Sequence, residues 1–221
     1  MKIVNLEQNS EAWLDWRKTG IGSSDAPAIL GISPWKTRRE LWEEKVMSYH
    51  TPHKIFSSAQ LKIINEKMKA RECSNESAKN RGKTLEPEAR AEYERWMNIS
   101  CDTICGVHED HEYLKVSLDG WTPEIRHFIE IKAPNRGYHE NSLDRTKNPW
   151  DRLPEIYKPQ IWHQFVVSDA LTGHYVSYHP KFPPASRLAI VPLTRDEEQL
   201  RNFLAIETEF WEMVKSGKYE E

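Results

Sequence analysis

The sequence predicts an α/β fold with a mixed central β-sheet flanked by helices. Three observations support this prediction: a helix-rich first half, three successive β-rich segments in the middle, and a helix followed by two more β-rich segments near the C-terminus. This order is typical of a sheet covered by helices. The 221 residues are enough for one sizeable core. We therefore expect a single domain over 1–221, with a helical portion at about 1–98 and a sheet core at about 99–195.

The expected helices of the first half are marked by capping residues. Ser10 is suited to cap a helix over 10–19, and Thr37 with Glu40 forms a capping box for the next one. Between them, GIGSSDAPAILGISPW predicts two turns around a short apolar segment. Residues 51–75 predict a loop that contains one helix near 58–70. A helix over about 76–98 follows, with Tyr93 and Trp96 as core contacts.

The expected sheet begins after residue 98. Segments DTICGV, EYLKVSLDG and RHFIEIKAP are short, β-rich and separated by turn residues, which predicts consecutive strands. Residues 135–153 predict a loop, and 154–168 a buried helix with Pro159 in its first turn. GHYVSYHP and RLAIVPL predict two more strands. Thr194 with Glu197 predicts the cap of a C-terminal helix that ends at Gly217.

Charge and cysteine content narrow the function classes. Residues 1–90 carry 16 Lys and Arg against 12 Asp and Glu, whereas residues 91–221 carry 15 against 22. This asymmetry suits a protein that binds phosphates on one side and metal ions on another, although chance explains it equally well. Three cysteines without a second Cys pair argue against disulfides and structural zinc. There is no signal sequence or apolar membrane span, so we expect a cytoplasmic protein.

Asp119, Glu130 and Lys132 are the candidate chemical groups. Glu130 and Lys132 are two residues apart on one predicted strand and share a face, and Asp119 ends the preceding strand. Hard divalent cations prefer oxygen ligands, so Asp119, Glu130 and the Ile131 carbonyl could hold one. Lys132 could orient the attacking water. Spacing alone favours a solvated hairpin, but the apolar neighbours of Glu130 argue against an exposed edge, and Gly120 predicts a sharp turn with open access.

Several motifs, in order, resemble the YqaJ-like viral recombinase family, the phage lambda exonuclease group of PD-(D/E)XK nucleases. The matching segments cover about residues 10–180: WLDWRKTGIGSSDAPAILGISPWKTRRELWEEK, RGKTLEPEAR, VSLDG, IEIKAP and YKPQIWHQF. Leu118 stands where the superfamily name implies proline. The resemblance implies a restriction-endonuclease-like core. It also implies an Mg²⁺-dependent (or Mn²⁺-dependent) 5′→3′ exonuclease with one or two ions per site, which acts on double-stranded DNA ends and leaves 3′ overhangs for recombination.

The resemblance also implies roles for residues outside the hairpin. Arg17, Ser24 and Ser117 would hold the 5′-phosphate, and Glu86 would join the metal ligands. A glutamine, Gln160 or Gln164, would lie near the metals, and we place Gln160 in the catalytic set. The resemblance further implies a homotrimeric ring and a single-strand annealing protein as partner. It also implies that this is a phage or prophage protein in a bacterial host.

Several alternatives stay open from the sequence. Read alone, Ser24 is a helix N-cap, and Lys36, Arg38 and Arg39 are solvated charges at a helix start. Trp150 is either a core plug or a wedge that stacks on a base. An endonuclease with the same core, or a catalytically silent DNA-binding module, would also fit the catalytic segments. A 5′-phosphate pocket speaks against the former and the intact acids against the latter.

Overall fold

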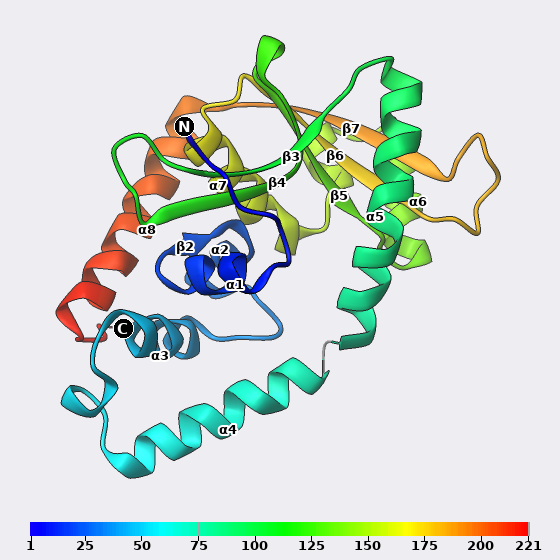
Figure 1. The fold of residues 1–221 in the computed structure, drawn as a ribbon. Helices are drawn as coiled ribbons and strands as arrows, with labels where there is room; N and C mark the ends of the chain where they lie inside the picture. The colour runs from blue at the N-terminus through cyan, green and yellow to red at the C-terminus, as the bar shows by residue number, and fades with distance from the viewer. Residues whose placement is uncertain (75, 221) are drawn as a thin grey trace.

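The computed structural model describes residues 1–74 and 76–220, with side chains undescribed at 52 and 71–79. Its centre is one seven-stranded sheet in the order β1-β3-β4-β5-β6-β7, with β2 paired to β4 (Figure 1). The strands are β1 (Lys2–Val4), β2 (Ile21–Gly22), β3 (Asp102–Val107), β4 (Leu114–Thr122), β5 (His127–Lys132), β6 (Thr172–Tyr178) and β7 (Leu188–Thr194). The predicted mixed sheet and its five strands are confirmed. β1 and β2, three and two residues long, were too short to be predicted.

The pairing of β4 leaves a window on one of its edges. Along the other edge, β3 pairs antiparallel with β4 from Lys115 to Trp121. On the window edge, β2 pairs only with Leu114 and Lys115, and β5 pairs only with 120–122. In the part of the chain that the structure describes, residues 116–119 of β4 therefore have no strand partner on this edge, and these four residues form the window. β5 itself is a central strand, parallel to β6 over its full length, as its apolar composition predicted.

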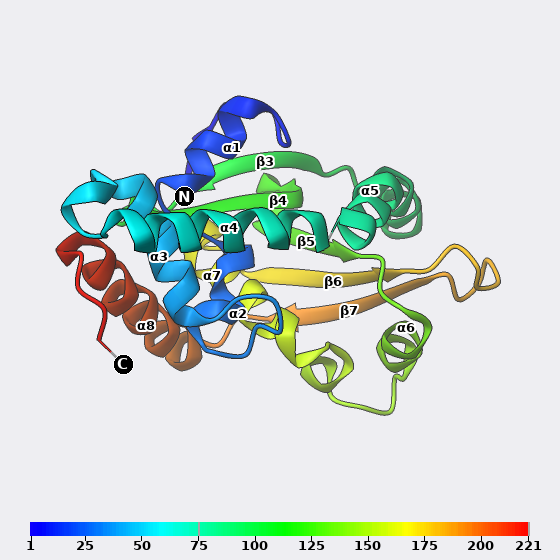
Figure 2. The same ribbon diagram turned by 90° about the horizontal axis from the view of Figure 1, so that it is seen from below.

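Helices cover both faces of the sheet. Helix α5 (Glu76–Met97) crosses one face, where Ala89 and Tyr93 pack with Ile129 and Ile131 of β5. Helix α7 (Lys158–Ser168) packs on the opposite face, where the rings of Phe165 and Phe128 lie 4.8 Å apart. Alternate residues of β5 thus face the two cores. α8 (Glu197–Ser216) covers α7 in turn, and Figure 2 shows α5 and α8 at opposite ends of the molecule.

The N-terminal helices follow the predicted caps. Ser10 caps α1 (Glu11–Lys18) by accepting from the Trp13 N–H, and Thr37 with Glu40 forms the capping box of α3 (Arg38–Tyr49). α4 (Ser58–Ser74) is longer than predicted and runs from α3 towards α5 (Figure 1). The segment predicted as two turns contains β2, a 3₁₀ turn (Ser23–Asp25) and the short α2 (Ala26–Ile29).

Four further predictions about local structure are wrong. The expected loop 135–153 contains α6 (Arg136–Leu143) and a 3₁₀ turn (Pro149–Arg152). Asp196, not Thr194, caps α8, because Thr194 is the last residue of β7. Trp96 is 62% exposed, since the apolar stripe of α5 runs past the sheet after Tyr93.

The fourth concerns Gly120, which makes no turn, because β4 continues to Thr122. Instead, a Cβ at Gly120 would lie 2.7 Å from the sulfur of Cys101 and 2.7 Å from the Ile129 side chain. Glycine is therefore required there by close packing rather than by open access. The turn that joins β4 to β5 comes later, at Pro123–Arg126, where Arg126 has a positive φ of 48°. None of the helices in the described ranges has the length and apolar character that a membrane crossing needs.

Candidate active site

Asp119 lies where β4 and β5 part. The ladder between these strands ends at Gly120 and Ile129, and the next free backbone N–H of β5, that of Ile131, donates to Asp119 Oδ2 at 2.8 Å. The carboxylate thus takes the place of a backbone partner. Because the N–H and C=O of one strand residue point to the same side, the Ile131 carbonyl also faces this window.

Glu130 is the most buried acid of the site, with 2% of its surface exposed. Its Oε1 accepts from Lys132 and from the Gln160 amide, and its Oε2 accepts from the Gln164 amide. The sequence left open which glutamine approaches the site, and the structure brings both to the same carboxylate. They can do so because they are four residues apart, on one face of α7.

Glu86 reaches the same region from α5. Its Oε1 is paired with Arg90 one helical turn later, and the Arg90 Nε donates to the Asp119 carbonyl at 2.5 Å. Sequence reasoning missed Arg90, although it ends the RGKTLEPEAR segment at i, i+4 from Glu86. Gly82 precedes Glu86 by four residues, and a Cβ there would meet no atom of the described residues within 4 Å, so packing against them does not require glycine at this position.

Like charges are crowded at this point. Burial, and then the negative charges of Glu130 and Glu86, hold the pKa of Asp119 well above its usual range, against the opposing effect of Lys132. For Lys132, burial disfavours the ammonium, but Glu130 and Asp119 outweigh it and raise its pKa. Three acids therefore share two cations, Lys132 and Arg90, with one negative charge in excess.

This set of groups fits a hard divalent cation. The donors are carboxylate and carbonyl oxygens, the type that Mg²⁺ prefers. Within the ranges described, no three His, Cys, Asp or Glu side chains already form a metal cage, because the carboxylates are turned towards N–H partners. A bound cation would relieve the repulsion that raises the Asp119 pKa. Gln164 Oε1, buried and without a hydrogen-bond partner in the described structure, adds an oxygen nearby.

The predicted phosphate residues form a second group beside the first. Arg17 Nη2 donates to Ser24 Oγ at 2.5 Å, and the Arg17 guanidinium lies 4.4 Å from the Trp13 ring centroid. The Trp13 indole N–H in turn donates to Ser117 Oγ at 2.8 Å. One indole therefore joins Arg17 to Ser117. The i, i+4 spacing of Trp13 and Arg17 on α1 was the signal for this contact, but we did not use it to predict a role for Trp13.

A buried ion pair holds the turn that carries Ser24. Asp25 Oδ2 accepts from the Gly22 N–H at 3.1 Å and pairs with Lys45 of α3 at 2.7 Å. Burial works against the Asp25 carboxylate, but Lys45, Lys36 and Arg17 outweigh it and hold its pKa well below the usual range. Ser24 does not cap a helix, since it lies within the 3₁₀ turn and its partner is Arg17.

The two groups meet on β4. Ser117 and Asp119 are two residues apart on β4, so their Cα atoms lie roughly 6.6 Å apart along the strand. Both lie in the unpaired window, with β2 and the Ser24 turn on one side and β5 on the other. The arrangement places the acidic group (Asp119, Glu130 and Glu86) next to the phosphate-binding group (Arg17, Ser24 and Ser117), with Ser117 and Asp119 both partly exposed.

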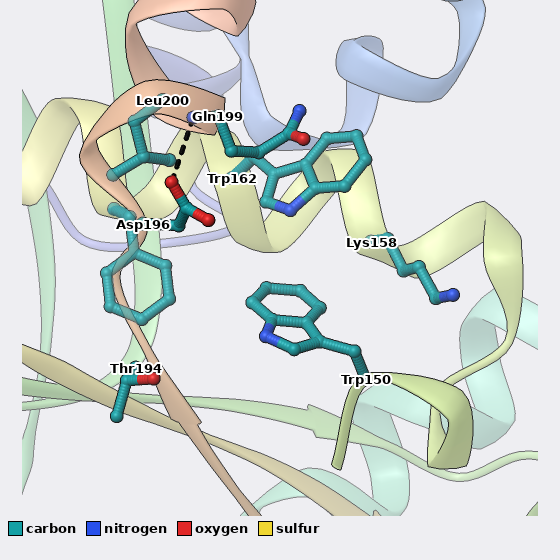
Figure 3. Close-up of a pocket in the computed structure, with 8 residues that line it drawn as sticks. Trp150, Lys158, Trp162, Thr194, Asp196, Gln199 and Leu200 are labelled. Carbon is teal, nitrogen blue, oxygen red and sulfur yellow. Dashed lines mark hydrogen bonds between the residues drawn. The ribbon is translucent and has the colours of Figure 1, made fainter. Parts of the chain in front are cut away.

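The remaining singled-out residues lie outside these groups. Trp150 is partly buried against the main core, its ring 6.3 Å from that of Trp162, which agrees with the plug interpretation. Figure 3 shows the two indoles facing each other across a pocket of about 210 Å³ beside the N-terminus of α8. Lys36, Arg38 and Arg39 are paired with Glu44, Glu209 and Glu43, respectively.

Comparisons with known proteins agree with this architecture. An alkaline exonuclease from Laribacter hongkongensis, LHK-Exo, superposes with a TM-score of 0.70 at 18% identity, over 94% of this chain and 93% of that one. Its complex with dAMP gives 0.69 at 20% identity and the same coverage. A phage-related exonuclease from Haemophilus somnus 129PT gives 0.59 at 14%, over 89% and 95%. These likenesses show a shared fold, a mixed sheet flanked by helices, and confirm the predicted fold class.

At the level of sequence, the "Uncharacterized protein YqaJ" of Bacillus subtilis (strain 168) is 24% identical over 208 residues. That match covers 94% of this chain and 57% of the relative, so the chain spans little more than half of the relative's length. The profile of the YqaJ-like viral recombinase domain matches residues 12–171. Because this match extends over more than half of the chain, the protein belongs to the YqaJ-like viral recombinase domain family.

Proposed function

We propose that this protein is an Mg²⁺-dependent 5′→3′ exonuclease that degrades linear double-stranded DNA and leaves 3′ single-stranded overhangs. The observation that carries the proposal is the window of β4, where Ser117 of the phosphate-binding group (Arg17, Ser24 and Ser117) lies two residues from Asp119 of the acidic group (Asp119, Glu130 and Glu86). Family membership and the exonuclease fold support it. The LHK-Exo complex with dAMP, a nucleoside monophosphate, also suits an enzyme that releases mononucleotides.

The acidic group is suited to phosphodiester hydrolysis. Asp119, Glu130, Glu86 and the Ile131 carbonyl would hold one or two Mg²⁺ ions, or Mn²⁺ in their place. Such an ion neutralises phosphate charge and lowers the pKa of a bound water. Gln160 and Gln164 hold the Glu130 carboxylate in one orientation by hydrogen bonds to its two oxygens. Lys132 stays protonated beside Glu130 and can donate to the attacking water or to a phosphate oxygen.

The phosphate-binding group is suited to selecting one end of a DNA strand. A guanidinium binds phosphate through two parallel N–H bonds, and hydroxyls complete such a site. Arg17 has donors to spare beyond its bond to Ser24, and Ser117 offers a hydroxyl from β4. A terminal phosphate carries more charge than an internal one, so this group favours a 5′ end. With the 5′-phosphate held there, the short step from Ser117 to Asp119 would bring the first phosphodiester to the acidic group.

The assembly we propose rests on the family resemblance. We expect a single nuclease domain, three copies of which form a ring around DNA, and a single-strand annealing protein as the partner in recombination. A phage or prophage protein of this kind would act in the bacterial cytoplasm. Size-exclusion chromatography with light scattering should give the mass of a trimer, and a stable monomer would contradict the ring.

The direct test of the activity uses linear duplex DNA labelled separately at each 5′ end, with a closed circular duplex of the same sequence as control. With Mg²⁺, we expect mononucleotide release from both 5′ ends and an intact circle. Cutting of the circle would favour the endonuclease alternative. Binding without any cutting would favour a catalytically silent DNA-binding module.

Two substitutions test the acidic group. Asp119→Ala and Lys132→Ala should each abolish digestion while DNA binding, measured by fluorescence anisotropy, persists. Asp102→Ala, an exposed aspartate on the neighbouring β3, is the matched control and should digest normally. Full activity of either site variant would refute the assignment of these residues.

A third substitution tests the phosphate-binding group. The protein should digest 5′-phosphorylated ends faster than 5′-hydroxyl ends, and Arg17→Ala should remove this preference. Lys18→Ala, which removes the adjacent cation in the last turn of α1, should retain it. Equal rates on the two ends with the unmodified protein would refute the end-selection argument.

A further inference from the structure

We propose that Arg90 is a positioning residue that fixes the Glu86 carboxylate against β4 so that Glu86 can join Asp119 and Glu130 around a divalent cation. The inference rests on the proposed function, because it assumes that the acidic group binds such a cation. It assigns a role to a residue that neither the sequence motifs nor the family resemblance singled out.

Arg90 makes two bonds that join two elements. Its Nε donates to the Asp119 carbonyl at 2.5 Å, and its Nη2 pairs with Glu86 Oε1. The first acceptor belongs to β4 and the second to α5. Both side chains of the pair are largely withdrawn from solvent, with 19% of Arg90 and 29% of Glu86 exposed. The guanidinium therefore ties the acid on the helix to the backbone of the strand that bears the other acid.

Glu86 needs this tie more than its neighbours do. Asp119 is held by the Ile131 N–H, and Glu130 by Lys132 and two glutamine amides. Among the residues that the structure describes, only Arg90 donates a hydrogen bond to the Glu86 carboxylate. A glutamate side chain has three rotatable bonds, and ordering it for metal binding has an entropic cost that a preformed bond reduces.

The geometry requires arginine rather than a cation in general. The N–H groups of Nε and Nη2 project from the same planar fork, so one side chain reaches two acceptors at a fixed spacing. The i, i+4 spacing of Glu86 and Arg90 on α5 brings the pair together. The bond uses Oε1 of Glu86 and leaves Oε2 for a cation. A lysine at position 90 would keep the charge but lacks the rigid fork.

A positive charge near a cation site could instead weaken metal binding by repulsion, and the two effects predict opposite results. Repulsion predicts that Arg90→Lys behaves like the unmodified protein and that Arg90→Gln binds metal more tightly. Positioning predicts that both variants bind more weakly. We expect positioning to dominate, because Arg90 bonds Oε1 of Glu86 and so lies farther from the cation than Oε2, the oxygen that would bind it.

The test measures metal binding without DNA. Mn²⁺ is titrated into metal-free protein, and free Mn²⁺ is followed by its electron paramagnetic resonance signal. Arg90→Lys and Arg90→Gln should both weaken binding about 10-fold or more, the usual effect of removing a residue that orients a ligand. Arg95→Lys, an exposed arginine on the same helix, should not change it. Unchanged binding by Arg90→Lys, or tighter binding by Arg90→Gln, would overturn the inference.

A double-mutant cycle shows whether Arg90 acts through Glu86. In a Glu86→Gln background, Arg90→Lys should cause no further loss of Mn²⁺ affinity. A second loss of about 10-fold would mean that Arg90 acts by a route other than Glu86 and would overturn the inference. Thermal unfolding of each metal-free variant checks that it is folded. If the unmodified protein bound no Mn²⁺, the proposal that the acidic group holds a divalent cation would be refuted, and this inference with it. Uptake unaffected by the Arg90 variants would overturn the inference alone.

Discussion

Asp119→Asn should make the metal-free protein more stable, although it removes a residue proposed as essential. Burial disfavours the Asp119 carboxylate, which is also repelled by Glu130 and Glu86 and attracted by Lys132. Two unit charges about 4–6 Å apart interact by about 3–4 kcal/mol at an effective dielectric constant of about 20. Two repulsions against one attraction leave one such contribution, which partial exposure reduces to about 1 kcal/mol. Asparagine can still accept from the Ile131 N–H, so the hydrogen bond at 2.8 Å is kept.

The assay is thermal unfolding in EDTA, followed by the same measurement with Mg²⁺. A gain of about 1 kcal/mol corresponds to a rise of about 2–4 °C in Tm for a chain of this size. Asp102→Asn, which removes an exposed aspartate on β3, should leave Tm unchanged. With Mg²⁺, only the unmodified protein should gain stability, so the difference should shrink or reverse. A lower Tm for Asp119→Asn in EDTA would show that the acids are not mutually repulsive and would refute the electrostatic account of this site.

Three other predictions concern a buried ion pair, the Trp13 indole and Gly120. His163 is fully buried with Glu207, and although burial disfavours its charge, Glu207 outweighs this and raises its pKa. The stabilisation by protonated His163 should therefore be complete below the unfolded-state pKa of about 6.5 and be lost as pH rises through the folded-state pKa. We expect Tm to fall above about pH 6.5, and His163→Gln should make that fall smaller. Trp13→Phe keeps a ring beside the guanidinium but removes the hydrogen bond to Ser117 at 2.8 Å. Since such a bond contributes about 1 kcal/mol, we expect the preference for 5′-phosphate to weaken by about 5- to 10-fold. An unchanged preference would contradict this. Gly120→Ala should lower the stability by about 1–3 kcal/mol through overpacking, measured by urea unfolding, with Gly82→Ala, where nothing lies within 4 Å, as the control that should not.

What the sequence could predict depended on local signals. Ser10, Thr37 and Gly217 end or begin helices through their own backbone and side-chain preferences, and the structure confirms all three. α6 was missed because its buried residues are polar. His139 bonds to Ser177 Oγ and the Ser186 carbonyl, each at 2.8 Å, so no apolar periodicity marks the helix.

The site divides in the same way. Glu130 and Lys132 could be paired from the sequence, since strand alternation alone puts them on one face. The link from Arg17 through Trp13 to Ser117 joins residues about 100 positions apart and depends on how α1 docks on β4. No spacing rule predicts such docking. The roles of Ser24 and Glu86 came from the family resemblance for the same reason.

The window on β4 explains why these groups converge where they do. Unpaired backbone in the middle of a sheet is costly unless its polar groups find partners, and an open strand edge also invites unwanted pairing. Here β2 and β5 each pair with one end of β4 and leave 116–119 between them. Asp119 satisfies the first N–H that β5 cannot give to β4, and Ser117 is bonded to an indole. A full-length β5–β4 ladder would satisfy the same backbone N–H and C=O groups without these side chains, but it would close the window at 116–119. The interrupted ladder therefore leaves Ser117 and Asp119 next to each other on β4 and outside the β4–β5 pairing, as the proposed DNA-end site requires.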